Sequence, residues 1–133
     1  MEATDTLQFA ERPITQLSAG ERQRVFIAQC LAQTPKIILL DEPTNYLDIN
    51  HTIRIFNLFS TLNKERGVTV LSVLHDLNLA SRYCDKLILM SGGKIFDSGK
   101  TEDVLTATNI QKVYGITVII RRDEITGKLM ILY

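Results

Sequence analysis

The sequence has the length and composition of one globular domain: it contains 133 residues, 45% of them hydrophobic, which is enough to bury a core. Its 15 basic side chains equal its 15 acidic ones, so charge gives no support to a nucleic-acid, anionic-membrane or acidic-substrate function. Cys30 and Cys84 lie far apart, which favours reduced thiols over a disulfide framework or a metal site. The apolar runs have strand length and the first residues lack a signal-peptide pattern, so we expect a cytoplasmic location.

Helical and extended patterns alternate along most of the chain. Ser18 can cap a helix, and apolar residues then recur at helical spacing, which predicts a first helix. The apolar run over residues 36–40 is too short for a helix and predicts a strand covered on both faces, as in a parallel sheet. A second helix over residues 50–65, closed by Gly67, and a second strand over residues 68–74 are expected to follow.

The second strand leads into a further helix and a third strand. Asp76 is placed to cap a short helix that ends at Tyr83, and residues 86–90 form the third strand. Strand, helix, strand, helix and strand in this order are typical of an α/β fold with a helix-covered parallel sheet. A small accessory layer is expected after it, with a hairpin turn at residues 91–94, short helices over residues 101–105 and 109–114, and a last hairpin that joins residues 116–121 to 129–133 through Thr126-Gly127.

Polar side chains follow two of these strands at the point where each strand ends. Asp41 and Glu42 follow the first strand, and His75 and Asp76 follow the second. Ligands of open parallel sheets collect at the carboxyl ends of the strands. Asp41 could hold Mg²⁺ directly or through water, while Glu42 could orient or deprotonate an attacking water. The residues also permit a simpler interpretation, in which 41–44 is only a turn and Asp41 caps a local group.

The two histidines have different sequence settings. Beside the acidic pair, His75 could donate a hydrogen bond to a phosphate oxygen or help to hold the attacking water. The alternative for His75 is an ordinary core or surface histidine, which is the commoner fate of a lone histidine after a strand. His51 has no such neighbours, so we expect it on the surface, without a role in the site.

Small side chains mark the start of the first helix. At Ser18, Ala19 and Gly20 the exposed backbone N–H groups and the positive end of the helix dipole could contact a phosphate. A plain serine cap, with Glu21 completing the first turn, explains the same residues without any ligand. The local pattern leaves both interpretations open.

Taken together, these segments resemble the ATP-binding-cassette ATPase family. Residues 17–23, LSAGERQ, match its signature motif, usually written LSGGQ or LSGGE, and residues 37–42, IILLDE, match its Walker B strand with the catalytic glutamate. Residues 45–48, NYLD, resemble its D-loop, and His75 falls where the family places its switch histidine. Four motifs in the family's order and spacing are more specific than any one of them. Ala19 replaces the more usual first glycine, which we expect to narrow the room for a γ-phosphate.

The resemblance implies ATP as the ligand and Mg²⁺ as its metal ion, with ATP sandwiched between two cassettes arranged head to tail. Glu42 and His75 would be catalytic residues in the same cassette, and Asp41 would hold the metal ion. Phosphoryl transfer of this kind depends mostly on positioning and charge stabilisation. The remaining residues implied to bind the nucleotide are Ser18, Ala19, Gly20, Glu21, Gln23 and Asp48.

Within the family, the sequence looks most like the ATPase subunits of importers for iron-siderophores, haem or cobalamin. This resemblance is carried by residues 22–24, by the loop at 45–48 and by residues 113–115 with the hairpin that follows them. It implies transmembrane permease subunits as partners and a cytoplasmic position, peripheral at the inner face of the cell membrane. Nucleic acid is not expected as a partner, because the charge is balanced and the chain has no basic stripe.

The family's phosphate loop, the Walker A motif, is not found in this sequence. Residues 93–101 end in Gly-Lys-Thr but carry one residue too many between their glycines for G-x-x-x-x-G-K-[ST]. They also follow a glycine turn rather than a buried strand, so we expect a hairpin there. We therefore expect a truncated P-loop NTPase core, the C-terminal half of a cassette. Residues 1–34 would end its helical subdomain, and residues 35–133 would form the rest of the catalytic core with a small C-terminal α/β extension.

The sequence leaves two functions open. The first is the ATPase subunit of a metal-chelate importer, inactive alone and active once the N-terminal half with its phosphate loop is supplied. The second is a non-catalytic fragment or binding module that lends its signature motif to a complete cassette. In both cases the loss of neighbouring strands would leave apolar sheet surface uncovered, which predicts self-association or poor solubility.

Overall fold

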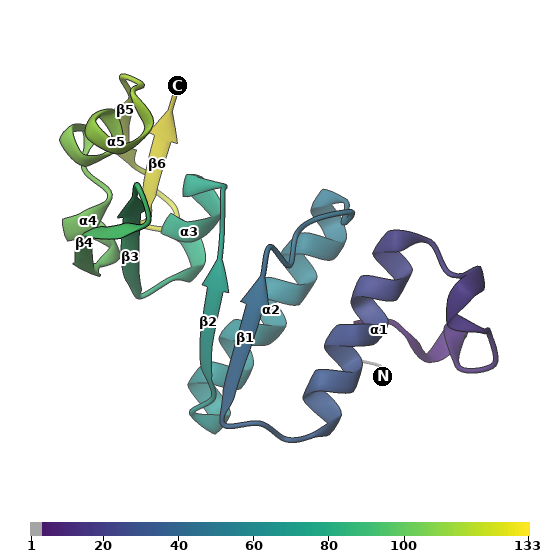
Figure 1. The fold of residues 1–133 in the computed structure, drawn as a ribbon. Coiled ribbons are helices and arrows are strands. Elements are labelled where there is room, and N and C mark those ends of the chain that lie inside the picture. Colours follow the sequence, from purple (N-terminus) through teal and green to yellow (C-terminus); the bar gives the residue numbers. More distant parts are fainter. Residues whose placement is uncertain (1–3) are drawn as a thin grey trace. The chain divides into compact units, whose positions relative to one another are not determined.

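The computed structural model describes residues 4–133 (Figure 1). The chain divides into two compact units, Met1–Val73 and Leu74–Tyr133. Each unit combines helices with strands and has a hydrophobic core of its own. None of the helices formed by residues 4–133 has both the length and the apolar character that crossing a membrane requires.

The first unit is built around one strand–helix–strand motif. Its elements are the 3₁₀ helices η2 (Leu7–Phe9) and η3 (Ile14–Gln16), the α-helices α1 (Ala19–Ala32) and α2 (Ile49–Arg66), and the strands β1 (Ile37–Asp41) and β2 (Thr69–Val73). β1 and β2 pair in parallel, with Ile37 opposite Thr69 and Asp41 opposite Val73. Helix α2 connects the two strands, which confirms the predicted parallel pair with its crossover helix.

Local hydrogen bonds and one glycine explain where the helices of this unit begin and end. Ser18 caps α1 in a capping box with Glu21, and Asp48 caps α2. Gly67 ends α2 in the left-handed conformation, with φ of 64°, which glycine adopts without steric cost. The predicted helix start at Ser18 and helix end at Gly67 are therefore confirmed.

The core of the first unit lies between its helices and one face of the β1–β2 sheet. Ile38 of β1 and Val68 pack there against Ile27 of α1 and against Ile55 and Phe59 of α2. All five side chains are buried. Burial of such apolar side chains is the main force that holds a small α/β unit together.

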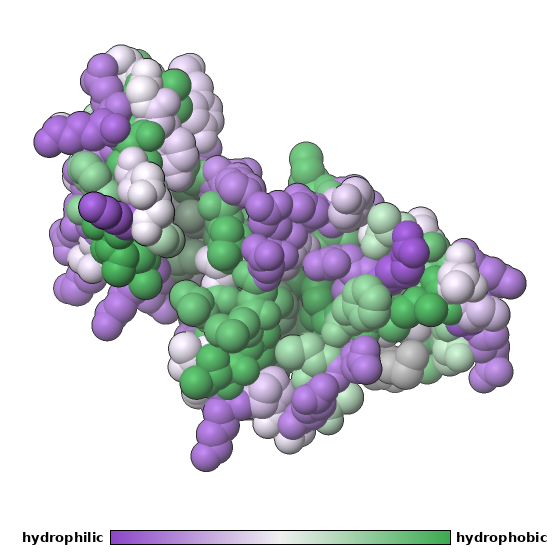
Figure 2. All heavy atoms as spheres, in the orientation of Figure 1, coloured by the Kyte–Doolittle hydropathy of each residue, from purple (hydrophilic) through white to green (hydrophobic). Residues whose placement is uncertain are grey.

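The opposite face of this sheet is uncovered within the described residues. Ile37 and Leu39 are 62% and 71% exposed, and Leu71 and Val73 of the paired strand are 56% and 51% exposed. We call these four residues the apolar face; Figure 2 shows hydrophobic residues gathered in the region of β1 and β2. The expectation that the first strand is covered on both faces is therefore wrong for this chain, because the residues of α1 and α2 in the core pack on the other side.

The second unit contains short helices and two antiparallel hairpins. Its elements are α3 (Leu77–Tyr83), β3 (Lys86–Ser91), β4 (Lys94–Lys100), α4 (Thr101–Val104), α5 (Ala107–Tyr114), β5 (Ile119–Arg122) and β6 (Leu129–Leu132). Its core consists of Leu77, Leu105, Ile110, Val118 and Ile131. The predicted helices and hairpins of the small C-terminal layer are all present, with boundaries shifted by a few positions.

Strand β3 does not extend the parallel sheet. It pairs antiparallel with β4, beginning with Lys86 opposite Lys100, whereas we expected a third strand beside the first two. Gly92 and Gly93 form the turn between β3 and β4, with positive φ angles of 55° and 73°. A tight glycine turn of this kind joins neighbouring strands over a short stretch of chain. Local pairing thus accounts for the difference.

The Gly-Lys-Thr segment belongs to this hairpin, as predicted. Gly99 and Lys100 end β4, and Thr101 begins α4, where its hydroxyl donates to the Cys84 carbonyl oxygen at 2.6 Å. An antiparallel strand followed by a helix of four residues lacks the buried strand and long helix of a phosphate loop. Cys84 and Cys30 are free, partly buried thiols, and burial raises the pKa of Cys84.

Candidate functional site

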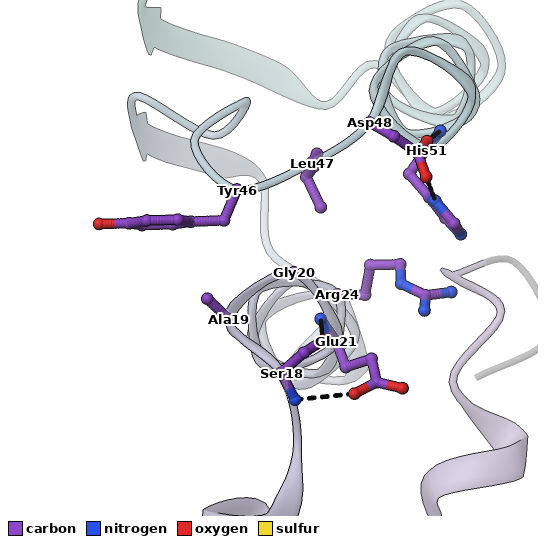
Figure 3. A pocket seen from close by; sticks show the side chains of 9 residues that line it. All are labelled: Ser18, Ala19, Gly20, Glu21, Arg24, Tyr46, Leu47, Asp48 and His51. Carbon is purple, nitrogen blue, oxygen red and sulfur yellow. Dashed lines mark hydrogen bonds and ion pairs between the residues drawn. The ribbon is translucent and has the colours of Figure 1, made fainter.

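The start of α1 carries the signature-like residues and is closed by two hydrogen bonds. The Glu21 N–H donates to the Ser18 hydroxyl oxygen at 3.3 Å, and the Ser18 N–H donates to a Glu21 carboxylate oxygen at 2.7 Å (Figure 3). The Ser18 N–H, and then the Ser18 hydroxyl, hold the pKa of Glu21 below its ordinary value because they stabilise the ionised carboxylate. The serine cap is thus present. The hydroxyl accepts from the Glu21 N–H and directs its own proton toward the Glu21 carboxylate.

A pocket of about 400 Å³ lies between the start of α1 and the turn that leads from β1 to α2 (Figure 3). All of the predicted nucleotide-binding residues except Gln23 line it. These residues are Ser18, Ala19, Gly20, Glu21 and Asp48, and they are joined by Arg24, Tyr46, Leu47 and His51. The signature-like and D-loop-like segments therefore meet at one place inside the first unit.

Gly20 allows α1 to approach this turn closely. A Cβ atom added at Gly20 would lie 2.5 Å from the Tyr46 carbonyl oxygen, far closer than van der Waals contact permits. Tyr46 has a positive φ of 66°, a conformation that bulky residues seldom adopt. Its side chain points away from the other pocket residues (Figure 3). The glycine at position 20 is therefore required by contact between two backbone segments.

Asp48 and His51 form a bonded pair at the start of α2. The His51 backbone N–H donates to Asp48 Oδ1 at 2.8 Å, and His51 Nδ1 lies 2.9 Å from Asp48 Oδ2. These two hydrogen bonds, the backbone one first, hold the pKa of Asp48 below its ordinary value. The His51 side chain is 26% exposed and lines the pocket, a position that the sequence did not predict.

The spacing of Asp48 and His51 in the sequence is a local signal for this pair. In a helix that begins after an N-cap residue, the N-cap and third helical side chains lie together, as in a capping box. Asp48 and His51 have this spacing. The signal depends on placing the helix start at residue 49, whereas periodicity alone placed it at residue 50.

Arg24 is a pocket residue that the sequence did not reveal. Its side chain is 8% exposed, and its Nη1 lies 3.2 Å from Asp5 Oδ2 and 3.1 Å from the Asp5 carbonyl oxygen. The guanidinium also lies over the Phe9 ring, 5.1 Å from its centroid, which is a favourable cation–π geometry. Arg24 thus ties the N-terminal segment to α1 and places a positive charge beside the pocket.

Asp41 and Glu42 lie at the end of β1, as predicted, but outside the pocket lining. Asp41 is exposed, and Glu42 is half-buried with a positive φ of 45°. The Asn45 side-chain amide donates to Glu42 Oε2 at 2.6 Å, and the Asn45 backbone N–H donates to the Glu42 carbonyl oxygen at 3.1 Å. Residues 41–44 therefore enter a turn, as the simpler interpretation expected, and this turn holds the Glu42 carboxylate in a defined position.

Two predicted site residues remain, Gln23 and His75. Gln23 is half-buried in α1 and does not line the pocket. His75 is exposed in the second unit, next to Asp76, which caps α3 by accepting from the backbone N–H groups of Asn78 and Leu79 at 2.8 and 2.9 Å. The predicted cap at Asp76 is confirmed. His75 and the Asp41–Glu42 turn belong to different units, and their grouping stays a prediction.

The donor groups fit a phosphate and a magnesium ion only in part. The α1 dipole favours negative charge at the start of the helix, whereas the Tyr46 carbonyl oxygen fills the space beside Gly20. Among residues 4–133, no three His, Cys, Asp or Glu side chains gather to hold a metal ion. Mg²⁺ commonly takes one or two carboxylates with phosphate oxygens and waters. An exposed Asp41 meets that need for a carboxylate.

Comparison with known proteins identifies the family. The family model described as "ABC transporter" matches residues 1–45. The chain is 45% identical over 127 residues to the ferric enterobactin transport ATP-binding protein FepC of Escherichia coli (strain K12), covering 96% of this chain and 47% of that protein. The chain belongs to the ABC transporter family.

Two further ABC-family relatives are import proteins by name. The iron(3+)-hydroxamate import ATP-binding protein FhuC of Bacillus subtilis (strain 168) is 44% identical over 128 residues, covering 96% of this chain and 48% of that protein. The cobalamin import ATP-binding protein BtuD of Halobacterium salinarum (strain ATCC 29341 / DSM 671 / R1) is 41% identical over 131 residues, covering 98% and 33%. The chain thus spans about half of the FepC and FhuC proteins, and about a third of BtuD.

Solved structures of ABC proteins have the same fold as this chain. A metal-chelate type ABC transporter in an inward-facing conformation matches with a TM-score of 0.81 and 27% identity, covering 98% of this chain and 56% of that chain. The dimeric ABC transporter cassette MJ0796 matches with a TM-score of 0.69 and 38% identity, covering 75% and 44%. The α/β fold of an ABC cassette core is therefore shown over most of the chain.

Proposed function

We propose that this chain is part of the ATP-hydrolysing subunit of an ABC importer for a metal chelate, such as an iron-siderophore, haem or cobalamin. The observation that carries this function is the pocket in which the start of α1 meets the turn at residues 45–48. The names of the FepC, FhuC and BtuD relatives support the substrate class. Residues 1–34 would end the helical subdomain, and residues 35–133 would belong to the catalytic core and its extension.

In this function each predicted residue has one task. Bound ATP would supply the phosphoryl group, and Mg²⁺ would supply charge neutralisation at its phosphates. Asp41 would hold the metal ion, Glu42 would take a proton from the attacking water, and His75 would donate a hydrogen bond to a phosphate oxygen or hold that water. The Ser18 hydroxyl would turn its proton from the Glu21 carboxylate to a phosphate oxygen while it still accepts from the Glu21 N–H. The other nucleotide-binding residues are Ala19, Gly20, Glu21, Gln23 and Asp48.

The proposed site is shared between polypeptides. The pocket residues serve the nucleotide held by a second cassette in a head-to-tail dimer, and Glu42 and His75 serve the nucleotide of their own cassette. A polypeptide segment with a phosphate loop, which the printed sequence lacks, completes that cassette. Transmembrane permease subunits are the further partners, and they place the assembly at the cytoplasmic face of the cell membrane.

Reconstitution with the half that carries the phosphate loop tests this function. The full chain is mixed with a polypeptide that contains the phosphate-loop half of an import cassette, and hydrolysis of Mg·ATP is measured. Each component alone should be inactive and the mixture active, and Glu42→Gln should lower the rate about 100-fold or more because it removes the general base. Glu65→Gln, an exposed change near the end of α2, should leave the rate unchanged. If the two polypeptides bind each other but the complex hydrolyses no ATP, the proposal is contradicted.

A non-catalytic binding module is the second candidate. It rests on one observation, which fits the catalytic function as well: none of Asp41, Glu42 and His75 lines the pocket. In that role the chain would bind a complete cassette, and its pocket residues would contact the nucleotide of that cassette and raise the rate of hydrolysis. The stimulation would then be the same for the unmodified chain and for Glu42→Gln, which separates this role from the catalytic one.

A further inference from the structure

The turn after β1 holds the Glu42 carboxylate with a side chain from the same turn. Asn45 Nδ2 donates to Glu42 Oε2 at 2.6 Å, a short distance typical of hydrogen bonds to charged groups. The backbone of Asn45 donates to the Glu42 carbonyl oxygen at 3.1 Å. Asn45 is thus bonded to Glu42 through both its main chain and its side chain.

The turn that presents Asn45 is fixed at several points. Pro43 is fully buried, and its ring restricts the backbone at the turn. Leu47 packs against the core of the first unit, and its backbone N–H donates to the Thr44 carbonyl oxygen at 3.1 Å. On the other side, Gly20 of α1 contacts the Tyr46 carbonyl group. The backbone that presents the exposed Asn45 side chain is thus held in place near Glu42.

We propose that Asn45 is a positioning residue that orients the Glu42 carboxylate for its work on water. This role rests on the proposed ATPase function and deepens it. The amide can only donate to a carboxylate at this position and takes no proton from it, so it holds the carboxylate without competing for the proton that Glu42 accepts. Holding Oε2 restricts rotation of the group and therefore the direction of the other oxygen. Catalysis by a general base depends on this geometry.

A spectroscopic experiment tests the contact without nucleotide. In ¹H–¹⁵N spectra of the full chain, one side-chain amide proton of Asn45 should be displaced from the position of a solvated amide because it is bonded to Glu42. Glu42→Ala should return it to that position, whereas the side-chain signal of Asn50, an exposed residue on the first turn of α2, should not move. An Asn45 signal that is the same in both proteins would overturn the proposal.

A kinetic experiment tests the consequence in the reconstituted cassette. Asn45→Ala removes the donor, and Asn45→Asp keeps the shape but replaces the donor with a charged acceptor. Each should lower kcat about tenfold or more with KM for ATP unchanged, since the net value of a hydrogen bond to a charged group corresponds to about this factor. Asn45→Gln keeps the amide and should recover part of the rate. Asn50→Ala is the matched control and should have no effect.

The outcomes separate the two levels of inference. If Asn45→Ala only lowers the melting temperature and leaves kcat unchanged, Asn45 merely stabilises the turn and the positioning role is overturned. If the unmodified chain forms the cassette but hydrolyses no ATP, the proposed function fails and the positioning role fails with it. A fall in kcat with unchanged circular dichroism, together with the displaced Asn45 signal, supports the role.

Discussion

Gly20 shows how a single missing methyl group can decide the geometry of a site. Gly20→Ala would normally stabilise a helix by about 1 kcal/mol. Here the new Cβ would lie 2.5 Å from the Tyr46 carbonyl oxygen, and relieving such overpacking typically costs about 1–3 kcal/mol. We expect faster amide hydrogen exchange throughout α1 and in the turn at residues 45–48, measured peptide by peptide.

The control for this substitution is Gly99→Ala in the second unit. A Cβ at Gly99 would meet a Val104 methyl group at 3.6 Å, which is ordinary contact. This variant should leave exchange in its own unit unchanged or slightly slower. If the α1 amides of Gly20→Ala exchange as slowly as those of the unmodified protein, or more slowly, the turn moves away without loss of stability. The contact with Tyr46 would then not explain why residue 20 is glycine.

At the scale of residues, the sequence predicted those parts of the site that depend on near neighbours. The Ser18 cap, the position of Glu42 at a strand end and the Asp76 cap all follow from adjacent sequence. The Arg24–Asp5 pair joins residues 19 positions apart, and no local sequence pattern predicts this contact. The bond from Asn45 to Glu42 forms within a turn in which Glu42 and Tyr46 have positive φ angles of 45° and 66°. Sequence patterns alone did not predict these angles.

At the scale of elements, Asn78 joins a helix to the edge of a hairpin. Its side-chain amide donates to the Ile131 carbonyl oxygen at 3.0 Å, and its side-chain oxygen accepts from the Ile131 N–H at 2.8 Å. Asn78→Ala would leave both backbone groups of a buried residue without these partners, and we expect a loss of about 2 kcal/mol in the free energy of unfolding. Thermal unfolding and the exchange rate of the Ile131 amide measure the effect.

Gln111→Ala is the control for Asn78, because Gln111 is exposed on α5 of the same unit. It should change neither the melting temperature nor exchange at Ile131. If the Ile131 amide exchanges as slowly in Asn78→Ala as in the unmodified protein, β6 is held by other contacts, such as the Ser81 hydroxyl that donates to the Leu129 carbonyl oxygen at 2.6 Å.

Element boundaries were predictable because caps, glycine turns and apolar spacing are local signals. Helix α2 was expected over residues 50–65 and spans Ile49–Arg66, and the last hairpin was expected with its turn at Thr126-Gly127, where the structure has it. Strand partners were less predictable. β3 has the composition of a core strand, yet it pairs with β4, because pairing depends on which strands are brought together and not on composition.

At the scale of the whole molecule, the apolar face predicts association. Ile37, Leu39, Leu71 and Val73 are each more than half exposed, and grouped apolar side chains of this kind favour contact with another surface. We expect the sedimentation coefficient of the unmodified chain to rise with concentration in analytical ultracentrifugation. A monodisperse monomer over the whole concentration range would contradict this expectation.

A paired substitution tests whether the apolar face is responsible. Leu39 lies opposite Leu71 in the sheet, so Leu39→Glu with Leu71→Lys places charges of opposite sign on neighbouring strands, where they attract each other. This double variant should fold and should be a monomer at every concentration tested. Ile125→Glu, which removes an apolar residue that is 95% exposed in the other unit, should associate as the unmodified chain does.

The apolar face also has a consequence for the life of the protein in a cell. Chaperones and proteases act continuously on unfolded chains, so a loss of about 1–2 kcal/mol in stability can change abundance several-fold. A chain with its sheet open on one side would be removed quickly when made alone and would persist when that side is covered. Its cellular half-life would then depend on the concentration of the polypeptide that covers the sheet. The amounts of this chain and of that polypeptide would rise and fall together even if their genes were regulated separately.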